Sequence, residues 1–243
     1  MADRLDKFIS ENSSLTRSEA KKALSGGRVT VNGLVSKKGE LKVTDEDEVA
    51  LDGKNLKKIG LVYVMLNKPA GVISATEDSR DRTVLDLIKE NREIFEKCPK
   101  NGLFPIGRLD KDTEGLLVIS NDGQLSHNLL SPTKHVEKEY IAECEGTLAK
   151  DAAERFEAGL QVGDEYKALP AKLTVLSDDG KKCTLKIVLT EGRFHQVKRM
   201  CHEVGAEVVF LKRISFGKLV LPDDLKVGEM RFVCKEDITG SDN

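Results

Sequence analysis

A short glycine-bounded stretch, GRLDKDTEGLLVISNDG at residues 107–123, holds the residue types whose spacing is most suggestive of chemistry. Asp110 stands in a turn-like segment just ahead of the apolar run LLVI. Gly107 and Gly115 allow close backbone approach, and the Thr113 hydroxyl can hydrogen-bond the loop onto itself. We therefore expect a rigid loop that presents a carboxylate. An ordinary loop ion pair with the neighbouring arginine is the alternative interpretation of the same residues.

Most other kinds of catalytic site lack their usual motifs. The chain has no GxGxxG, GxxxxGK[ST], HExxH or GxSxG pattern, so nucleotide-cofactor, zinc-hydrolase and serine-nucleophile sites are disfavoured. Its five cysteines are odd in number and form no CxxC pair, which argues against a disulfide framework or a zinc site. We expect no cofactor and no metal, and chemistry by a carboxylate acting as nucleophile or base.

Composition describes a water-soluble globular protein. Of 243 residues, 39% are hydrophobic and 33% are charged, and the formal net charge is −2. No apolar run approaches the ~20 residues of a membrane span, and MADRLDKFIS lacks the apolar core of a signal peptide. We expect a cytoplasmic protein that does not bind membranes. A balanced total charge can still conceal a basic face, so the distribution of charge matters more.

The first 44 residues have the pattern of a small basic module. Apolar residues at helical spacing predict a helix from Leu5, and Thr16 with Glu19 forms a capping box that opens a second helix. The alternating stretch around Asn32-Gly33 predicts a hairpin.

The module also carries a local surplus of positive charge. It holds nine Lys or Arg against five acids, which suggests contact with phosphates. A solvated helix face is the alternative. The candidate RNA-binding residues in this segment are Arg4, Arg17, Lys21, Lys22 and Arg28.

From residue 61 strands and helices mix without a regular βαβ alternation, which predicts an α+β fold with a mixed or antiparallel sheet. The run at 116–119 shows no polar alternation, so we expect a central strand buried on both faces. The expected organisation is a module at 1–55, a linker at 56–60 and a larger domain at 61–243.

The loop at 107–123 resembles the signature loop of pseudouridine synthases of the RsuA/RluA type. LNKPAGV, KEYIAE and EGRFHQVKRM are similar to the remaining motifs of that family and follow in the same order. The front segment resembles a small αL RNA-binding module. Together these similarities extend to about residue 232, and they imply a small N-terminal αL RNA-binding module followed by a pseudouridine synthase catalytic domain.

The resemblance implies a reaction and roles for three catalytic residues. The N1–C1′ bond of a uridine breaks, and the freed uracil rejoins the ribose through C5, without cofactor or metal. Asp110 would act as nucleophile or as base on the ribose, a choice that the sequence leaves open. Arg193 would be the basic partner that keeps Asp110 ionised, and the uracil would pack on Tyr140.

The target base must leave its stack to reach such a site. Arg108 would fill the gap or clamp a phosphate, and Lys68 with Pro69 would shape the site. The basic helix after residue 193 would contact the RNA backbone through His195, Lys198 and Arg199.

The motif details are most similar to the branch that modifies a single uridine of 16S rRNA, of the uridine-516 type. The expected partner is therefore 16S rRNA or a small-subunit assembly intermediate, bound by a monomer. Three alternatives stay open. They are a synthase acting on a 23S rRNA uridine, a non-catalytic RNA-binding assembly protein, and a carboxylate-dependent hydrolase with Asp112 or Glu114 as the acid.

Overall fold

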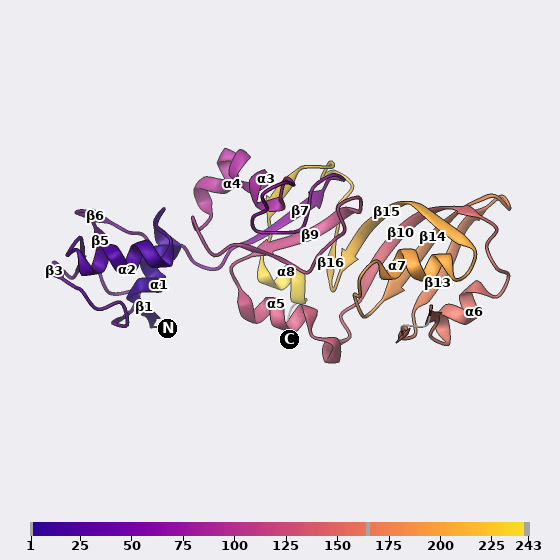
Figure 1. Cartoon of the computed structure of the whole chain (residues 1–243), viewed down its shortest axis with the longest axis horizontal. Helices are drawn as coiled ribbons and strands as arrows, with labels where there is room; N and C mark the ends of the chain where they lie inside the picture. The colour runs from indigo at the N-terminus through magenta and orange to yellow at the C-terminus, as the bar shows by residue number, and fades with distance from the viewer. Residues whose placement is uncertain (1, 164–165, 241–243) are drawn as a thin grey trace. The chain divides into compact units, whose positions relative to one another are not determined.

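The computed structural model describes residues 2–163 and 166–240 and divides into two compact units (Figure 1). One unit takes in residues 1–62 and 88–104, and the other takes in 63–87 and 105–243. No helix among the described residues is long and apolar enough to cross a bilayer.

The first unit contains the helices and hairpin expected from the sequence. Thr16 caps the second helix, and both halves of its capping box with Glu19 are present. Asn32 and Gly33 form the hairpin turn with φ of 50° and 80°, the left-handed values that such a two-residue turn requires. Its elements are β1 (Asp3–Arg4), α1 (Leu5–Asn12), α2 (Arg17–Ser25), β2 (Val29–Val31), β3 (Leu34–Val35), β4 (Lys42–Val43), β5 (Val49–Leu51), β6 (Lys54–Asn55) and α4 (Arg92–Lys97).

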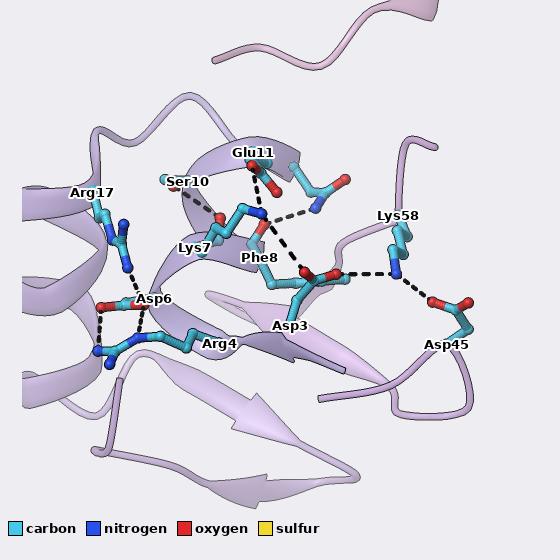
Figure 2. Close-up of polar contacts among 11 residues, drawn as sticks. Asp3, Arg4, Asp6, Lys7, Phe8, Ser10, Glu11, Arg17, Asp45 and Lys58 are labelled. Atoms are coloured by element: carbon cyan, nitrogen blue, oxygen red, sulfur yellow. Dashed lines mark hydrogen bonds and ion pairs between the residues drawn. The ribbon is translucent and has the colours of Figure 1, made fainter. Parts of the chain in front are cut away.

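A buried carboxylate holds the start of α1 beside α2. Asp6 is fully buried, and it accepts hydrogen bonds from Arg4 at 3.0 and 3.1 Å and from Arg17 at 3.3 Å (Figure 2). The hydrogen bond from Arg4, assisted by Arg17, lowers the pKa of Asp6 to about 2. Helices α1 and α2 and strands β2, β4 and β5 all contribute to the apolar core, which includes Leu5, Phe8, Ile9, Ala20, Ala23, Leu24, Val29, Val43 and Val49.

The expected linker at 56–60 is bonded to the first unit. Lys58 forms ion pairs with Asp3 at 3.1 Å and Asp45 at 2.6 Å, which Figure 2 shows as one chain of charges. The Ile59 N–H donates to the Asn12 side chain at 2.7 Å. These contacts attach residues 58 and 59 to the module.

The second unit is built on a mixed nine-stranded sheet, which confirms the α+β fold class. Its main strand order is β13-β14-β10-β15-β9-β7-β17, with β16 on β15 and β8 on β9. Its strands are β7 (Tyr63–Lys68), β8 (Phe104–Ile106), β9 (Glu114–Ser120), β10 (Lys138–Gly146), β13 (Lys172–Asp178), β14 (Lys182–Leu189), β15 (Ala206–Phe216), β16 (Leu219–Val220) and β17 (Met230–Phe232).

Strand β9 is the central strand predicted from the run LLVI. It lies between β7, with which it is antiparallel, and β15, with which it is parallel. Residues 115–120 are all buried. The absence of polar alternation thus correctly predicted a strand covered on both faces.

Helices cover the sheet of the second unit. Helix α6 packs on β13, and α7 packs on β15 (Figure 1). The remaining elements are α3 (Val84–Glu90), α5 (Gly123–Leu130), the 3-10 turn η1 (Pro132–Lys134), α6 (Ala152–Glu157), α7 (Gln196–His202), α8 (Lys235–Thr239) and a small hairpin of β11 (Gln161–Val162) and β12 (Tyr166–Lys167).

We predict that Asp6→Asn destabilises the protein by about 2 kcal/mol at pH 7, because the folded-state pKa of Asp6 lies well below its ordinary value. This stabilisation is complete above the ordinary pKa of about 4 and is lost as pH falls through about 2. Urea unfolding of wild type and variant should therefore show a gap that narrows as pH falls from 4 toward 2.

The exposed ion pair of Asp45 supplies the control for this test. Asp45→Asn should change stability much less, because surface ion pairs contribute little. Equal losses for the two variants at pH 7 would contradict the assignment.

Candidate active site

A buried lysine anchors the loop that carries Asp110. The Lys68 side chain is inaccessible to solvent, and its ammonium donates to the carbonyls of Val72 at 2.6 Å, Pro69 at 2.9 Å and Lys111 at 3.4 Å. Burial lowers the pKa of Lys68 to about 8, against the pull of nearby carboxylates. The ammonium thus ties the NKPAG turn to the residue that follows Asp110.

Two further contacts hold the same loop. The Ser74 hydroxyl donates to the Leu109 carbonyl at 2.9 Å and accepts from the Leu109 N–H at 3.0 Å. The Gly71 N–H donates to the Lys111 carbonyl at 2.7 Å. Both neighbours of Asp110 are therefore bonded to the 71–74 turn, which agrees with the expected rigidity.

The hydroxyl of Thr113 does not close the loop as expected from the sequence. The loop is closed instead by the Thr113 N–H, which donates to the Asp110 carbonyl at 3.1 Å. Thr113 is 1% exposed, and within the described part of the chain its Oγ1 has no hydrogen-bond partner. A buried hydroxyl without a partner is costly unless something else completes it.

Asp110 and Tyr140 come to the same part of the second unit because β9 pairs with β15, the neighbour of β10. The two strands pair only at Glu114 with Lys212 and at Gly115 with Arg213. Arg213 is also the cross-strand partner of Tyr140 on β10. The Arg213 guanidinium donates from Nε to the Leu116 carbonyl at 2.8 Å, which adds a side-chain tie to this short junction.

Asp110 and Tyr140 both line a small cleft of about 70 Å³. Tyr140 is buried, whereas the Asp110 side chain is 30% exposed. The cleft brings together side chains from three separate sequence motifs. Among the residues that line it are Arg108, Asp110, Thr113, Tyr140, Arg193 and His195.

Two basic side chains, one just before α7 and one on it, approach Asp110. His195 Nε2 lies 3.8 Å from Oδ1, and Lys198 Nζ lies 3.8 Å from Oδ2. Lys198 also contacts both carboxylate oxygens of Asp112, at 2.6 and 2.7 Å. This contact lowers the pKa of Asp112. Lys198 therefore places positive charge beside the candidate catalytic carboxylate.

Arg193 differs from the partner expected for Asp110. It lines the cleft, but its Nε forms an ion pair with Glu191 at 3.3 Å. Its guanidinium also stacks over the Tyr166 ring at 4.3 Å. Arg193 thus shares the cleft with Asp110 while its guanidinium contacts Glu191 and Tyr166, and Lys198 and His195 lie 3.8 Å from the Asp110 carboxylate.

The other candidate RNA-binding residues fall into two groups. Arg4 and Arg17 are bound to Asp6, and Arg28 forms an ion pair with Asp52, although all three side chains remain about half exposed. The second group comprises Lys21, Lys22 and Arg108, which are exposed, and Arg199, which is partly buried with its guanidinium 5.5 Å from the centre of the Tyr166 ring.

Comparison with protein families agrees with this geometry. The model for RNA pseudouridylate synthase matches residues 62–203, more than half of the chain, and the S4 domain model matches residues 3–49. The chain belongs to the RNA pseudouridylate synthase family.

Individual relatives of this family match over nearly their full length. Ribosomal small subunit pseudouridine synthase A of Yersinia pestis is 40% identical, over 97% of this chain and 96% of its own. The Escherichia coli K12 protein of the same name is 39% identical, with 97% and 98% covered. A crystal structure of a pseudouridylate synthase superposes with a TM-score of 0.65 at 35% identity and covers 97% of both chains.

Several residues near this cleft were not singled out from the sequence. Arg213 and Tyr166 lie outside the motifs used above, and their importance follows from strand pairing and stacking. Lys138 stands two residues before Tyr140 in KEYIAE, a spacing that places both side chains on one face of the strand. Burial and nearby Arg213 lower the pKa of Lys138 to about 8.

We predict that Gly115→Ala lowers the free energy of unfolding by at least about 2 kcal/mol. Gly115 has a φ of 102°, and an added Cβ would overlap the Arg213 backbone. Thermal and urea unfolding would measure the loss.

Gly123→Ala is the matched control. Gly123 opens α5 with nothing near the position of an added Cβ, so alanine there should be neutral or slightly stabilising. A Gly115→Ala variant as stable as Gly123→Ala would show that the close β9–β15 approach is not required.

Proposed function

We propose that this protein converts one uridine of small-subunit ribosomal RNA, of the uridine-516 type, to pseudouridine, with Asp110 as the catalytic carboxylate. The observation that carries the proposal is the position of Asp110, in a cleft with Tyr140 and 3.8 Å from Lys198. The small-subunit substrate is inferred from the names of the Yersinia pestis and Escherichia coli relatives. We also propose that the protein acts as a monomer.

The reaction requires an anionic group at the ribose. The Asp110 carboxylate attacks C1′ or removes a ribose proton, and either step leads to cleavage of the N1–C1′ bond. The uracil then turns within the cleft, C5 bonds to C1′, and the C5 proton leaves. Lys198 places a positive charge 3.8 Å from the Asp110 carboxylate, where it can attract the anionic RNA.

The buried face of the cleft supplies surfaces for the uracil. Tyr140 offers an aromatic ring against which the flipped base packs. The Thr113 hydroxyl, which lacks a hydrogen-bond partner among the described residues, offers a polar contact to the substrate. Arg108, exposed at the rim, is placed to contact the RNA from which the uridine has left.

A carboxylate-dependent hydrolase fits the site poorly. Such an enzyme needs a second carboxyl group that stays protonated as the general acid. Asp112 is 71% exposed, and Lys198 lowers its pKa, so it is held in the ionised form instead. This observation argues against Asp112 as the general acid of a hydrolase.

We further propose that the N-terminal module supplies affinity for the RNA. The buried Asp6 holds the guanidiniums of Arg4 and Arg17 in place while leaving about half of each side chain exposed (Figure 2). Arginines oriented in this way can still donate to phosphate oxygens. Lys21 and Lys22 on α2 add exposed positive charge.

Release of tritium from uridine C5 tests the proposed reaction and its substrate class. Purified protein should release close to one tritium per molecule of C5-labelled 16S rRNA and none from 23S rRNA, because the C5 proton leaves only at the modified uridine. Release from 23S rRNA alone would show that the substrate is large-subunit rRNA. Failure to release tritium from either RNA, or from small-subunit assembly intermediates, would reject the synthase.

Charge reversal on α2 tests the proposed role of the module. The double variant Lys21→Glu and Lys22→Glu should bind 16S rRNA more weakly, and the slope of log affinity against log salt should be smaller by roughly 1.5 if both lysines contact phosphates. Filter binding between 50 and 300 mM salt would measure both the affinity and the slope.

Lys181→Glu, on the exposed β13–β14 turn, is the matched control and should leave the slope unchanged. Identical slopes for wild type and the α2 double variant would show that these lysines do not contact RNA.

A further inference from the structure

Phe194 is an exposed aromatic side chain with no role in the proposed reaction. It is 74% exposed, although it stands between two residues that line the cleft. An apolar ring in water gains nothing for folding. Its place beside a site that handles nucleobases therefore calls for a physical explanation.

Hydrogen bonds of the Gln196 side chain hold the turn that carries Phe194. Gln196 is buried, and its side-chain oxygen accepts from the Arg193 N–H at 2.9 Å while its amide nitrogen donates to Glu191 at 2.5 Å. Glu191 also accepts from the Leu169 N–H at 2.8 Å. The backbone on both sides of Phe194 is thus anchored, so its exposure belongs to an ordered turn.

Phe194 also forms one end of a stack that leads to the candidate catalytic carboxylate. Its ring lies 3.8 Å from the His195 ring, centroid to centroid, at an interplanar angle of 18°. His195 in turn lies 3.8 Å from Asp110. His195 adopts a φ of 50°, an unusual backbone conformation for a residue with a side chain.

We propose that Phe194 is the stacking platform for the nucleobase next to the target uridine. The proposal rests on the proposed function, since it assumes an RNA with one uridine flipped into the cleft. Phe194 is not among the described residues that line the cleft, so its ring meets a base beside the target. Aromatic side chains commonly bind unstacked bases in this way and accept any base.

Three substitutions test the platform in the full-length protein. Phe194→Leu keeps the apolar volume but removes the ring, so kcat/KM for tritium release from 16S rRNA should fall about tenfold. RNA binding should weaken in parallel. Phe194→Tyr keeps the ring and should stay within about twofold of wild type.

Val209→Ala removes another exposed apolar side chain, 61% exposed on β15 and outside the cleft lining, and should change nothing. Loss of activity in Phe194→Leu and Phe194→Tyr alike, or in neither, would overturn the platform. Circular dichroism should match wild type for all three variants.

Abasic substrates identify the stacked base. A synthetic RNA fragment spanning the modified uridine would carry an abasic nucleotide on its 5′ or its 3′ side. On the side of the stacked base, the abasic nucleotide should weaken RNA binding by wild type about tenfold. The same abasic RNA should bind to Phe194→Leu no more weakly than the intact RNA does. Independent losses on both sides would overturn the proposal.

The proposed function and the platform can fail separately. If wild type releases no tritium from 16S rRNA, 23S rRNA or small-subunit assembly intermediates, the proposed reaction fails. The binding comparison of Phe194→Leu with Phe194→Tyr on 16S rRNA still decides whether the ring contacts RNA.

Discussion

The close approach of Gly115 to Arg213 is the constraint on which the site depends. Strand β9 begins at the end of the Asp110 loop, and β15 is the neighbour of β10, which carries Tyr140. Only two residue pairs join β9 to β15, and one of them is Gly115 with Arg213. A side chain at Gly115 would push the strands apart. The distance between the Asp110 carboxylate and the Tyr140 ring is therefore set by the backbone contact between Gly115 and Arg213.

Two lysines lie close to the loop that carries the partly exposed Asp110 carboxylate. Lys68 is buried under the loop and satisfied by carbonyl oxygens, so it shapes the backbone. Lys198 is partly exposed and lies near both Asp110 and Asp112. The buried Lys68 holds the backbone of the loop, and Lys198 places positive charge beside the Asp110 carboxylate.

The sequence predicted elements whose signals are local. The Asn32-Gly33 turn, the Thr16 capping box and the unbroken apolar strand at 116–119 each depend on neighbouring residues, and the structure contains all three. The motifs also indicated that Asp110 and Tyr140 belong together, and both line one cleft.

Features decided by long-range partners could not be predicted in this way. Arg193 was expected to lie beside Asp110, and in the structure its guanidinium contacts Glu191 and Tyr166. The Thr113 hydroxyl was expected to close its own loop, but the Thr113 N–H forms that hydrogen bond instead. Residues 58 and 59 have the composition of a linker, but their partners Asp3, Asp45 and Asn12 lie far away in the sequence.

The most direct test of the account is the single-turnover rate of tritium release with saturating 16S rRNA for wild type and Asp110→Asn. Asparagine preserves the shape of the side chain but removes the anionic oxygen. We predict that release falls by at least about 10³-fold while RNA affinity stays within about threefold of wild type. Release within tenfold of wild type, with normal affinity, would show that another group performs the chemistry.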